Sequence, residues 1–127
     1  MQVRIQSKRA DGGATFVVAE TSLGVVMGRW HGADPIVGER YGVELDIGDE
    51  LVWGVTLRAS STAPSIVSSA ASSTIVATLV RIDDDVVVVA IADGITLLEA
   101  SGGAPDLAPG AHVRFEARDI TIYDART

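Results

Sequence analysis

The chain of 127 residues contains no cysteine, a single lysine and few aromatic residues. The absence of cysteine excludes disulfide bonds, thiolate metal sites and cysteine nucleophiles. Aromatic residues make up 5% of the sequence, which is too few for a surface on which nucleic-acid bases would stack. No apolar run reaches the roughly 20 residues of a membrane-spanning helix, and the opening residues lack the apolar core of a signal peptide. We therefore expect a cytoplasmic protein without membrane contacts.

The charged residues are predominantly acidic. Asp and Glu number 17 against 10 Lys and Arg, which gives a net charge of −7. Proteins that bind nucleic acids without sequence preference gain most of their affinity from Lys and Arg that neutralise phosphates, so this balance disfavours nucleic-acid binding. It equally disfavours an anionic membrane surface. A basic protein partner, by contrast, would be attracted.

Alternating β-branched residues are abundant, and they are clearest from Thr74 to Glu99. There they predict three strands joined by two turns, over residues 75–82, 86–92 and 95–99. Asp93-Gly94 between two apolar runs is a strong signal for a tight type I′ hairpin turn. No segment has a helical period of adequate length. The predicted fold class is all-β, in the form of one or two small antiparallel barrels.

The same alternation predicts further strands along the rest of the chain, over residues 3–8, 15–20, 25–30, 40–47, 51–57, 111–117 and 120–122. In the first, Val3, Ile5 and Ser7 are expected on one face and Arg4, Gln6 and Lys8 on the other. In the fifth, the inward residues are expected to be Leu51, Trp53, Val55 and Leu57. Residues 124–127 are expected to fray.

Residues 59–73 form a segment rich in Ser, Ala and Thr without any charge. Its composition predicts a flexible connector or long surface loop, in which Ile66 and Val67 dock loosely. The signals on its two sides occur in the same order. A shift of 72 positions, from Asp11 to Asp83, also places Val3 on Ile75. This predicts two five-stranded units, residues 1–58 and 74–127, although any two β segments share apolar alternation. Units this small are expected to pack together or to exchange strands.

The end of the chain carries a family resemblance. Pro109-Gly110, Val113 and the run Asp119-Ile120-Thr121-Ile122-Tyr123-Asp124 are similar to the close of a TOBE domain, a small OB-like barrel found after transporter ATPases and in molybdate-binding proteins. Five strands with a Gly/Pro loop between the third and fourth likewise resemble a minimal OB barrel. Tandem TOBE units bind oxyanions where two units meet, so the resemblance implies an anion site at the seam between the halves.

Carboxylates occur in two groups that could carry a function. Paired carboxylates can act as acid and base or bind Ca²⁺, yet these stand at alternate strand positions or in turns, where Asp is common. We therefore predict an acidic interaction surface, with Arg29 and Trp30 as further contacts. The predicted acidic residues are Glu44, Asp46, Asp49, Asp83, Asp84 and Asp85. Trp30 would be either an interface anchor or a core residue, whereas Trp53 is expected in the core.

Signals for catalysis or metal binding are weak. His31 and His112 are the only histidines, and they could join carboxylates in binding a divalent metal. Both positions are ordinary surface sites, a loop and an outward strand position, so we expect no metal and no cofactor. The sequence contains no Gly-x-Ser-x-Gly elbow and no phosphate-binding glycine loop ahead of a helix. We expect a protein that is not an enzyme.

Three functions remain in order of preference. The first is a non-catalytic interaction module that binds a basic protein, or a second copy in a homodimer, through its acidic surface or a strand edge. The second is a small-anion binder at the seam between the halves, using backbone N–H groups with Thr21, Ser22 and Arg29. The third is single-stranded nucleic-acid binding on a barrel face, which the acidic balance makes the least favoured.

Overall fold

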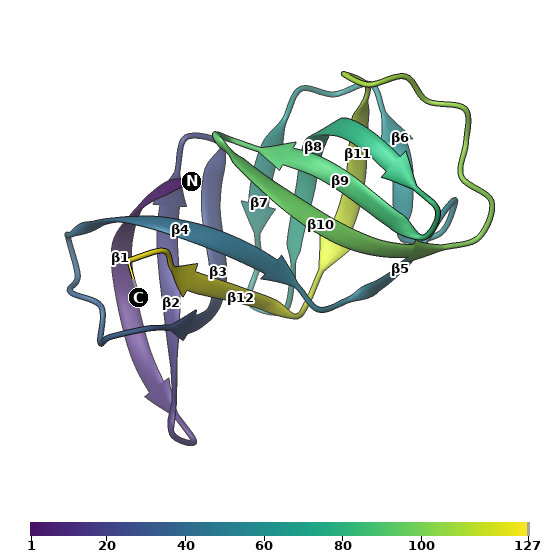
Figure 1. Cartoon of the computed structure of the whole chain (residues 1–127). Coiled ribbons are helices and arrows are strands. Elements are labelled where there is room, and N and C mark those ends of the chain that lie inside the picture. The colour runs from purple at the N-terminus through teal and green to yellow at the C-terminus, as the bar shows by residue number, and fades with distance from the viewer. Residues whose placement is uncertain (127) are drawn as a thin grey trace.

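The computed structural model of the chain describes residues 1–126, and its regular structure there consists of β-strands without helices (Figure 1). The all-β prediction is confirmed. In chain order the strands are β1 (Gln2–Asp11), β2 (Ala14–Thr21), β3 (Gly24–His31), β4 (Arg40–Ile47), β5 (Glu50–Val52), β6 (Leu57–Ser60), β7 (Ser65–Ser68), β8 (Ser73–Asp83), β9 (Val86–Ile91), β10 (Gly94–Ser101), β11 (His112–Ala117) and β12 (Ile120–Asp124). Within these residues no helix long and apolar enough to cross a membrane occurs.

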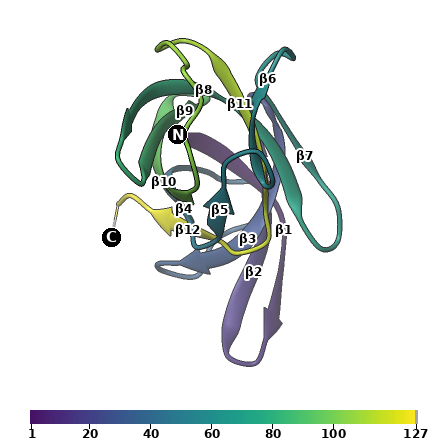
Figure 2. The ribbon, with the colours of Figure 1, turned by 90° about the vertical axis from the view of Figure 1, so that its right-hand side faces the viewer.

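One lobe of the molecule is a closed five-stranded barrel, which confirms the predicted small barrel, although its fifth strand is β12 and not the segment 51–57. Antiparallel pairs join β1 to β2, β2 to β3, β1 to β4 and β4 to β12. The ring closes where β12 lies parallel to β3, with Ile122 opposite Trp30. The β1–β2 hairpin extends beyond the ring and projects from the lobe (Figures 1 and 2). Closure satisfies the strand edges that an open sheet would expose.

The second lobe is built around the meander β8–β9–β10. The three strands predicted between Thr74 and Glu99 are confirmed. β11 pairs with β8 and carries β6 on its far side, while β7 pairs with the same part of β8 from the opposite edge. β5 lies parallel to β10, with Leu51 opposite Ala100. This lobe thus contains β5 to β11, seen on the right of Figure 1.

Two short crossings connect the lobes. The chain passes from β4 in the barrel to β5 in the second lobe through Gly48 and Asp49. It returns from β11 to β12 in the barrel through Arg118 and Asp119. The crossings touch, because the Gly48 N–H donates a hydrogen bond of 2.8 Å to the Asp119 carbonyl oxygen. The barrel therefore includes β12 from the C-terminal half of the sequence, and the second lobe includes β5 from the N-terminal half. The internal duplication stays a prediction.

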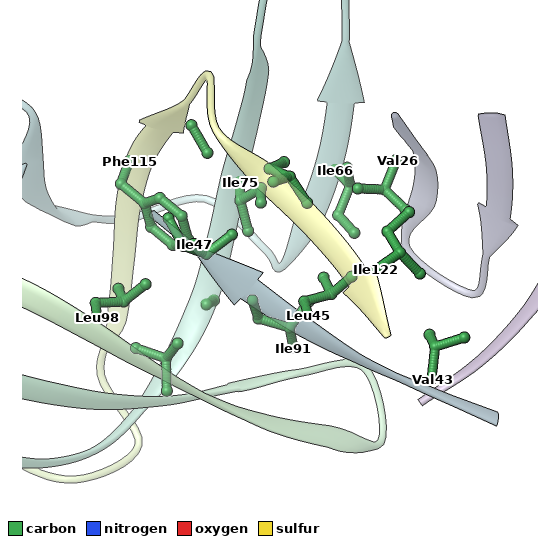
Figure 3. Close-up of a cluster of buried hydrophobic side chains, with 14 of the residues drawn as sticks. Val26, Val43, Leu45, Ile47, Ile66, Ile75, Ile91, Leu98, Phe115 and Ile122 are labelled. Atoms are coloured by element: carbon green, nitrogen blue, oxygen red, sulfur yellow. The ribbon is translucent and has the colours of Figure 1, made fainter. Parts of the chain in front are cut away.

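A single hydrophobic core extends through both lobes. Its close-up in Figure 3 shows Leu45 and Ile47 of β4 near Ile91 of β9 and Ile75 of β8, with Phe115 beyond them. Alternating inward positions of β-strands supply these side chains, which is why the period-two pattern identified most of the core. Within residues 1–126 no buried side-chain nitrogen or oxygen lacks a hydrogen-bond partner.

The predicted fifth strand is wrong in its continuity. It divides into β5 and β6, and between them Gly54 adopts a φ of 81°, a conformation that only glycine reaches without strain. Val55, expected inward, is 63% exposed at this turn. The turn is held by the Thr56 hydroxyl, which accepts a hydrogen bond of 2.8 Å from the Val52 N–H. Trp53 is buried as expected.

The segment 59–73 is not a loose connector. It contains β7, and Ile66 is only 3% exposed. The Ser68 hydroxyl donates to the Val25 carbonyl oxygen at 2.6 Å and shares a hydrogen bond of 2.7 Å with the Ser73 hydroxyl. The serine hydroxyls therefore form hydrogen bonds with the backbone and with each other. A short strand can pack here although its sequence lacks apolar alternation.

Two smaller expectations also differ from the structure. The turn between β9 and β10 has its positive φ at Ala92 (53°), while Gly94 already begins β10, so the predicted type I′ turn on Asp93-Gly94 does not form. Fraying is wrong for residues 124–126, because Asp124 is buried in β12 and the Arg126 guanidinium lies 4.3 Å from the centre of the Tyr41 ring. Thr127 lies outside the described residues.

Candidate functional site

A groove with a volume of about 250 Å³ lies where the two lobes meet. Its floor is the outer face of β1, β2 and β3, and its walls are residues 69–73, at the β7–β8 turn, and the crossing residues Arg118 and Asp119. Figure 2 shows the β7–β8 turn beside the β1–β2 hairpin. We call this feature the seam groove.

A register shift in β1 decides which side chains face the seam groove. Ile5 pairs with Ala19, but the shift between Ile5 and Ser7 sets Ser7 opposite Val18. Directly paired antiparallel residues share a face, so Ser7 lies on the outer, groove side instead of following Ile5 inward. The prediction that Val3, Ile5 and Ser7 share one face is therefore wrong from the bulge onward. Without this shift, the arginine two residues further along would also point into the barrel.

Arg9, Phe16 and Arg29 form a row across β1, β2 and β3 on the groove floor. Arg9 is opposite Phe16, and Phe16 is opposite Arg29. The two guanidinium carbons lie 4.9 and 5.9 Å from the centre of the Phe16 ring, within the range of cation–π attraction. Val18 and Met27, opposite each other in the neighbouring row, complete a half-buried apolar floor.

Positive charge is concentrated on this groove. Four of the 10 basic residues line it, against one carboxylate, that of Asp119. Lys8 is engaged by the Asp34 carboxylate at 3.0 Å and the Pro35 carbonyl oxygen at 2.8 Å, and Arg9 by the carboxylate of Asp11 at 3.3 Å. Across residues 1–126, the guanidinium groups of the other two, Arg29 and Arg118, form no hydrogen bond or ion pair. The groove thus offers free arginine donors in an acidic protein.

Small residues bring the walls close to the floor. A Cβ atom added at Gly28 would lie 2.7 Å from the Ile120 carbonyl oxygen, so glycine is required where β12 passes β3. This approach carries Arg118 and Asp119 to the rim. On the other wall, the Ser69 N–H donates to the Ser72 carbonyl oxygen at 2.8 Å and closes a tight turn.

The residues predicted for anion binding divide between two places. Arg29 lines the seam groove. Thr21 and Ser22 lie instead at the β2–β3 turn, where the Thr21 hydroxyl donates to the Gly24 carbonyl oxygen at 2.7 Å and accepts from the Leu23 N–H at 3.0 Å. They have a structural function in the turn and do not line the groove.

The predicted acidic surface is divided between the lobes. Glu44 and Asp46 point outward from β4 in the barrel, opposite Tyr123 and Thr121 of β12. In the second lobe, Asp83, Asp84 and Asp85 lie at the turn between β8 and β9. Asp49 lies at neither place. There Asp83 is bound by the Arg81 guanidinium at 2.7 Å.

Two of the residues predicted as surface contacts, Trp30 and Asp49, support the fold instead. Trp30 is 6% exposed; its indole N–H donates to the Ala33 carbonyl oxygen at 2.7 Å, and its ring meets that of Tyr41 edge-on with centres 5.1 Å apart. It is a core residue of the barrel and not a surface anchor. The Asp49 carboxylate accepts hydrogen bonds from the crossing residues Arg118 and Asp119.

The histidines lie in separate surroundings. The His31 ring contacts the ring of Tyr123, with centres 4.7 Å apart, beside Glu44 in a shallow hollow. The Nδ1 atom of His112 is 2.9 Å from the Thr62 carbonyl oxygen in the second lobe. Across residues 1–126 there is no group of three or more His, Cys, Asp or Glu side chains that could hold a metal ion.

One carboxyl group in the barrel has a perturbed pKa. The hydrogen bond from the Arg126 side chain lowers the pKa of Asp124, and this outweighs the opposing effect of burial. The guanidinium and the carboxylate are 3.2 Å apart. This pair lies in β12 and the residues after it, and does not line the seam groove.

Arg9, Phe16, Met27 and Arg118 were not recognised from the sequence as groove residues. Their spacing in the chain contains no motif, and only the bulge in β1 and the crossing after β11 bring them together. The side chains lining the groove offer charged groups, hydroxyl groups and an apolar floor. Comparisons of the chain with protein-family models, with curated proteins and with solved structures gave no match.

Proposed function

We propose that this protein is a non-catalytic binding module that holds a small anionic ligand in the seam groove. One observation carries the proposal: arginines gather on one groove of a protein whose net charge is −7, and the guanidinium groups of Arg29 and Arg118 are free. The planar guanidinium donates paired hydrogen bonds that match carboxylate and phosphate oxygens. An anion repelled by the rest of the surface would be attracted here.

The test compares two variants with the same change in charge. R29Q/R118Q removes the free guanidinium groups, and R40Q/R114Q removes two exposed arginines that do not line the groove. Melting temperatures are measured at low ionic strength with phosphate, sulfate, molybdate and phenyl phosphate. A ligand that binds the native state raises the melting temperature, so we expect a rise in the wild type and R40Q/R114Q only. No rise with any anion, or an equal rise in both variants, overturns the proposal.

We further propose that the two lobes are OB- or TOBE-like units that arose by duplication. Three pairings support this: each lobe has a three-stranded meander, a fourth strand antiparallel to the first, and a parallel partner for the third that comes from the other half. In the barrel the last pairing sets Trp30 opposite Ile122, and in the second lobe Ala100 opposite Leu51. Superposing β1–β4 on β8–β11 tests the idea, since a duplication requires the same path and hand in both.

A basic protein partner is the second candidate. Glu44 and Asp46 face outward on β4, and Glu44 lies beside the exposed ring of Tyr123, which suits a lysine or arginine side chain. Binding of an oligolysine peptide to the wild type and to E44Q/D46N tests this, and equal affinity would exclude the surface. Self-association is the third candidate, and it would use β6, which pairs with one strand only. A monomer by light scattering at all concentrations would exclude it.

A further inference from the structure

We infer that the seam groove takes an organic anion with a flat apolar body, and not a bare inorganic oxyanion. The inference rests on the proposed function and adds the class of ligand. Three features of the groove support it: its size, its apolar floor, and the row of Arg9, Phe16 and Arg29 that crosses that floor.

The groove is too large for an oxyanion alone. Its volume of about 250 Å³ equals that of about eight water molecules at roughly 30 Å³ each. A phosphate or molybdate ion held between two guanidinium groups would leave most of this space to solvent. A ligand with an organic body attached to the anionic group would fill it.

The apolar part of the floor offers no hydrogen bond to a small hydrated ion. Phe16, Val18 and Met27 are half-buried and lie against the open space of the groove. An ion pressed against them would lose water contacts without gaining hydrogen bonds, which is unfavourable. An apolar body in the same position would remove its own surface and theirs from water, which is favourable. The unbranched Met27 side chain can adapt to the shape of such a body.

The row of Arg9, Phe16 and Arg29 favours a flat body over an aliphatic chain. Both guanidinium groups lie within 6 Å of the Phe16 ring centre, at 4.9 and 5.9 Å. Guanidinium planes stack on aromatic faces, so a ring in the groove can extend this row. Arg29 is also opposite Thr121, two residues beyond Asp119, which sets it on the side of the groove near Arg118. The anionic group then belongs between Arg29 and Arg118, with the ring toward Met27.

Three probes separate the contributions by titration calorimetry at low ionic strength. Phenyl phosphate has the ring and the anion, inorganic phosphate only the anion, and phenol only the ring. We expect phenyl phosphate to bind about tenfold more tightly than either of the others, as burial of one ring face would give. M27S is expected to weaken phenyl phosphate several-fold and leave phosphate unchanged. V55S, an exposed substitution remote from the groove, is the control.

The outcomes distinguish the ligand class from the proposed function. Equal affinities for phosphate and phenyl phosphate, both abolished by R29Q/R118Q, overturn the flat body and leave an anion site. No binding of either probe, or binding that R29Q/R118Q does not change, overturns the proposed function as well. If M27S fails to fold, the site is tested instead by the changes in amide NMR shifts that each probe causes in the wild type. Shifts at Val18 and Met27 with phenyl phosphate, absent with phosphate, are expected, and shifts elsewhere overturn the inference.

Discussion

The Asp49 carboxylate accepts hydrogen bonds from the backbone N–H groups of Arg118 and Asp119, at distances of 2.9 to 3.1 Å. Asp49 belongs to the crossing from β4 to β5, and its two donors form the crossing from β11 to β12. One side chain therefore ties together the two places where the chain passes between the lobes. Because Arg118 and Asp119 also line the seam groove, this contact positions one of its walls.

Replacing Asp49 by alanine should loosen the crossing. Hydrogen bonds to a charged acceptor contribute about 1.5–3 kcal/mol, and partial exposure reduces this, so we expect the free energy of unfolding to fall by about 1–2 kcal/mol. Urea unfolding measures the loss. D46A removes a nearby exposed carboxylate and should change stability by less than about 0.5 kcal/mol. Equal stability of D49A and D46A would show that the contact does not support the crossing.

Substituting Gly24 by alanine should destabilise the junction of β3 and β7. Gly24 has a φ of 137°, and a Cβ atom there would overlap the carbonyl oxygen of Ile66. Gly38 has a φ of 90° with open space around it, so G38A carries only the backbone strain. We expect G24A to lose at least about 1 kcal/mol more than G38A. Faster hydrogen exchange of the Ile66 amide, which donates to the Leu23 carbonyl oxygen, should accompany the loss.

Two neighbouring residues in β7 test whether this segment is part of the folded core. Ile66 is 3% exposed and Val67 is 66% exposed. I66A should cost about 2–5 kcal/mol of unfolding free energy, as is usual for a buried isoleucine, and V67A should cost less than about 0.5 kcal/mol. Thermal unfolding compares them directly. Similarly small losses of unfolding free energy in both variants would show that residues 59–73 behave as a flexible connector.

The Asp124–Arg126 pair should make stability sensitive to acid. The pKa of Asp124 is lowered in the folded state from its ordinary value of 3.8, so the charged carboxylate stabilises the fold above that pH. This contribution decreases as the pH falls below 3.8 toward the lower folded pKa. D124N should therefore show a flatter decline of unfolding free energy between neutral and acid pH than the wild type. D106N changes an exposed aspartate and should show the same pH dependence of unfolding free energy as the wild type. If D124N shows that dependence too, the Asp124–Arg126 pair does not cause the acid sensitivity.

Local signals in the sequence were sufficient for most strands. β4 begins and ends where Arg40–Ile47 alternates, and β8, β9 and β10 follow the apolar runs between Asp and Gly turns. Where prediction failed, the cause was either a contact distant in sequence or a turn that the alternation does not indicate. β7 forms because Ile66 is buried against β3 and β8, which the serine-rich composition does not indicate. The fifth strand breaks because Gly54 turns the chain.

The candidate site was less predictable than the fold. Arg29 was identified, but the residues around it were not, because one residue of bulge in β1 reverses the faces of Ser7 and Arg9. A side-chain pattern of period two contains no warning of such a shift. Trp30 equally fitted an interface or the core, and only the closure of the barrel around it buries the ring.

By itself the sequence determined that the protein is all-β, where most of its strands lie, and that its charge is acidic. The fold class and the strand positions depend on neighbouring residues, since alternation and turn preferences act over a few positions. The net charge depends on composition alone. The tertiary structure alone decided that β12 closes the barrel beside β3, that β5 joins β10, and that basic residues from β1, β3 and a crossing meet on one groove. Those outcomes depend on strand register and on pairings between distant segments, which are selected by the packing of the whole core.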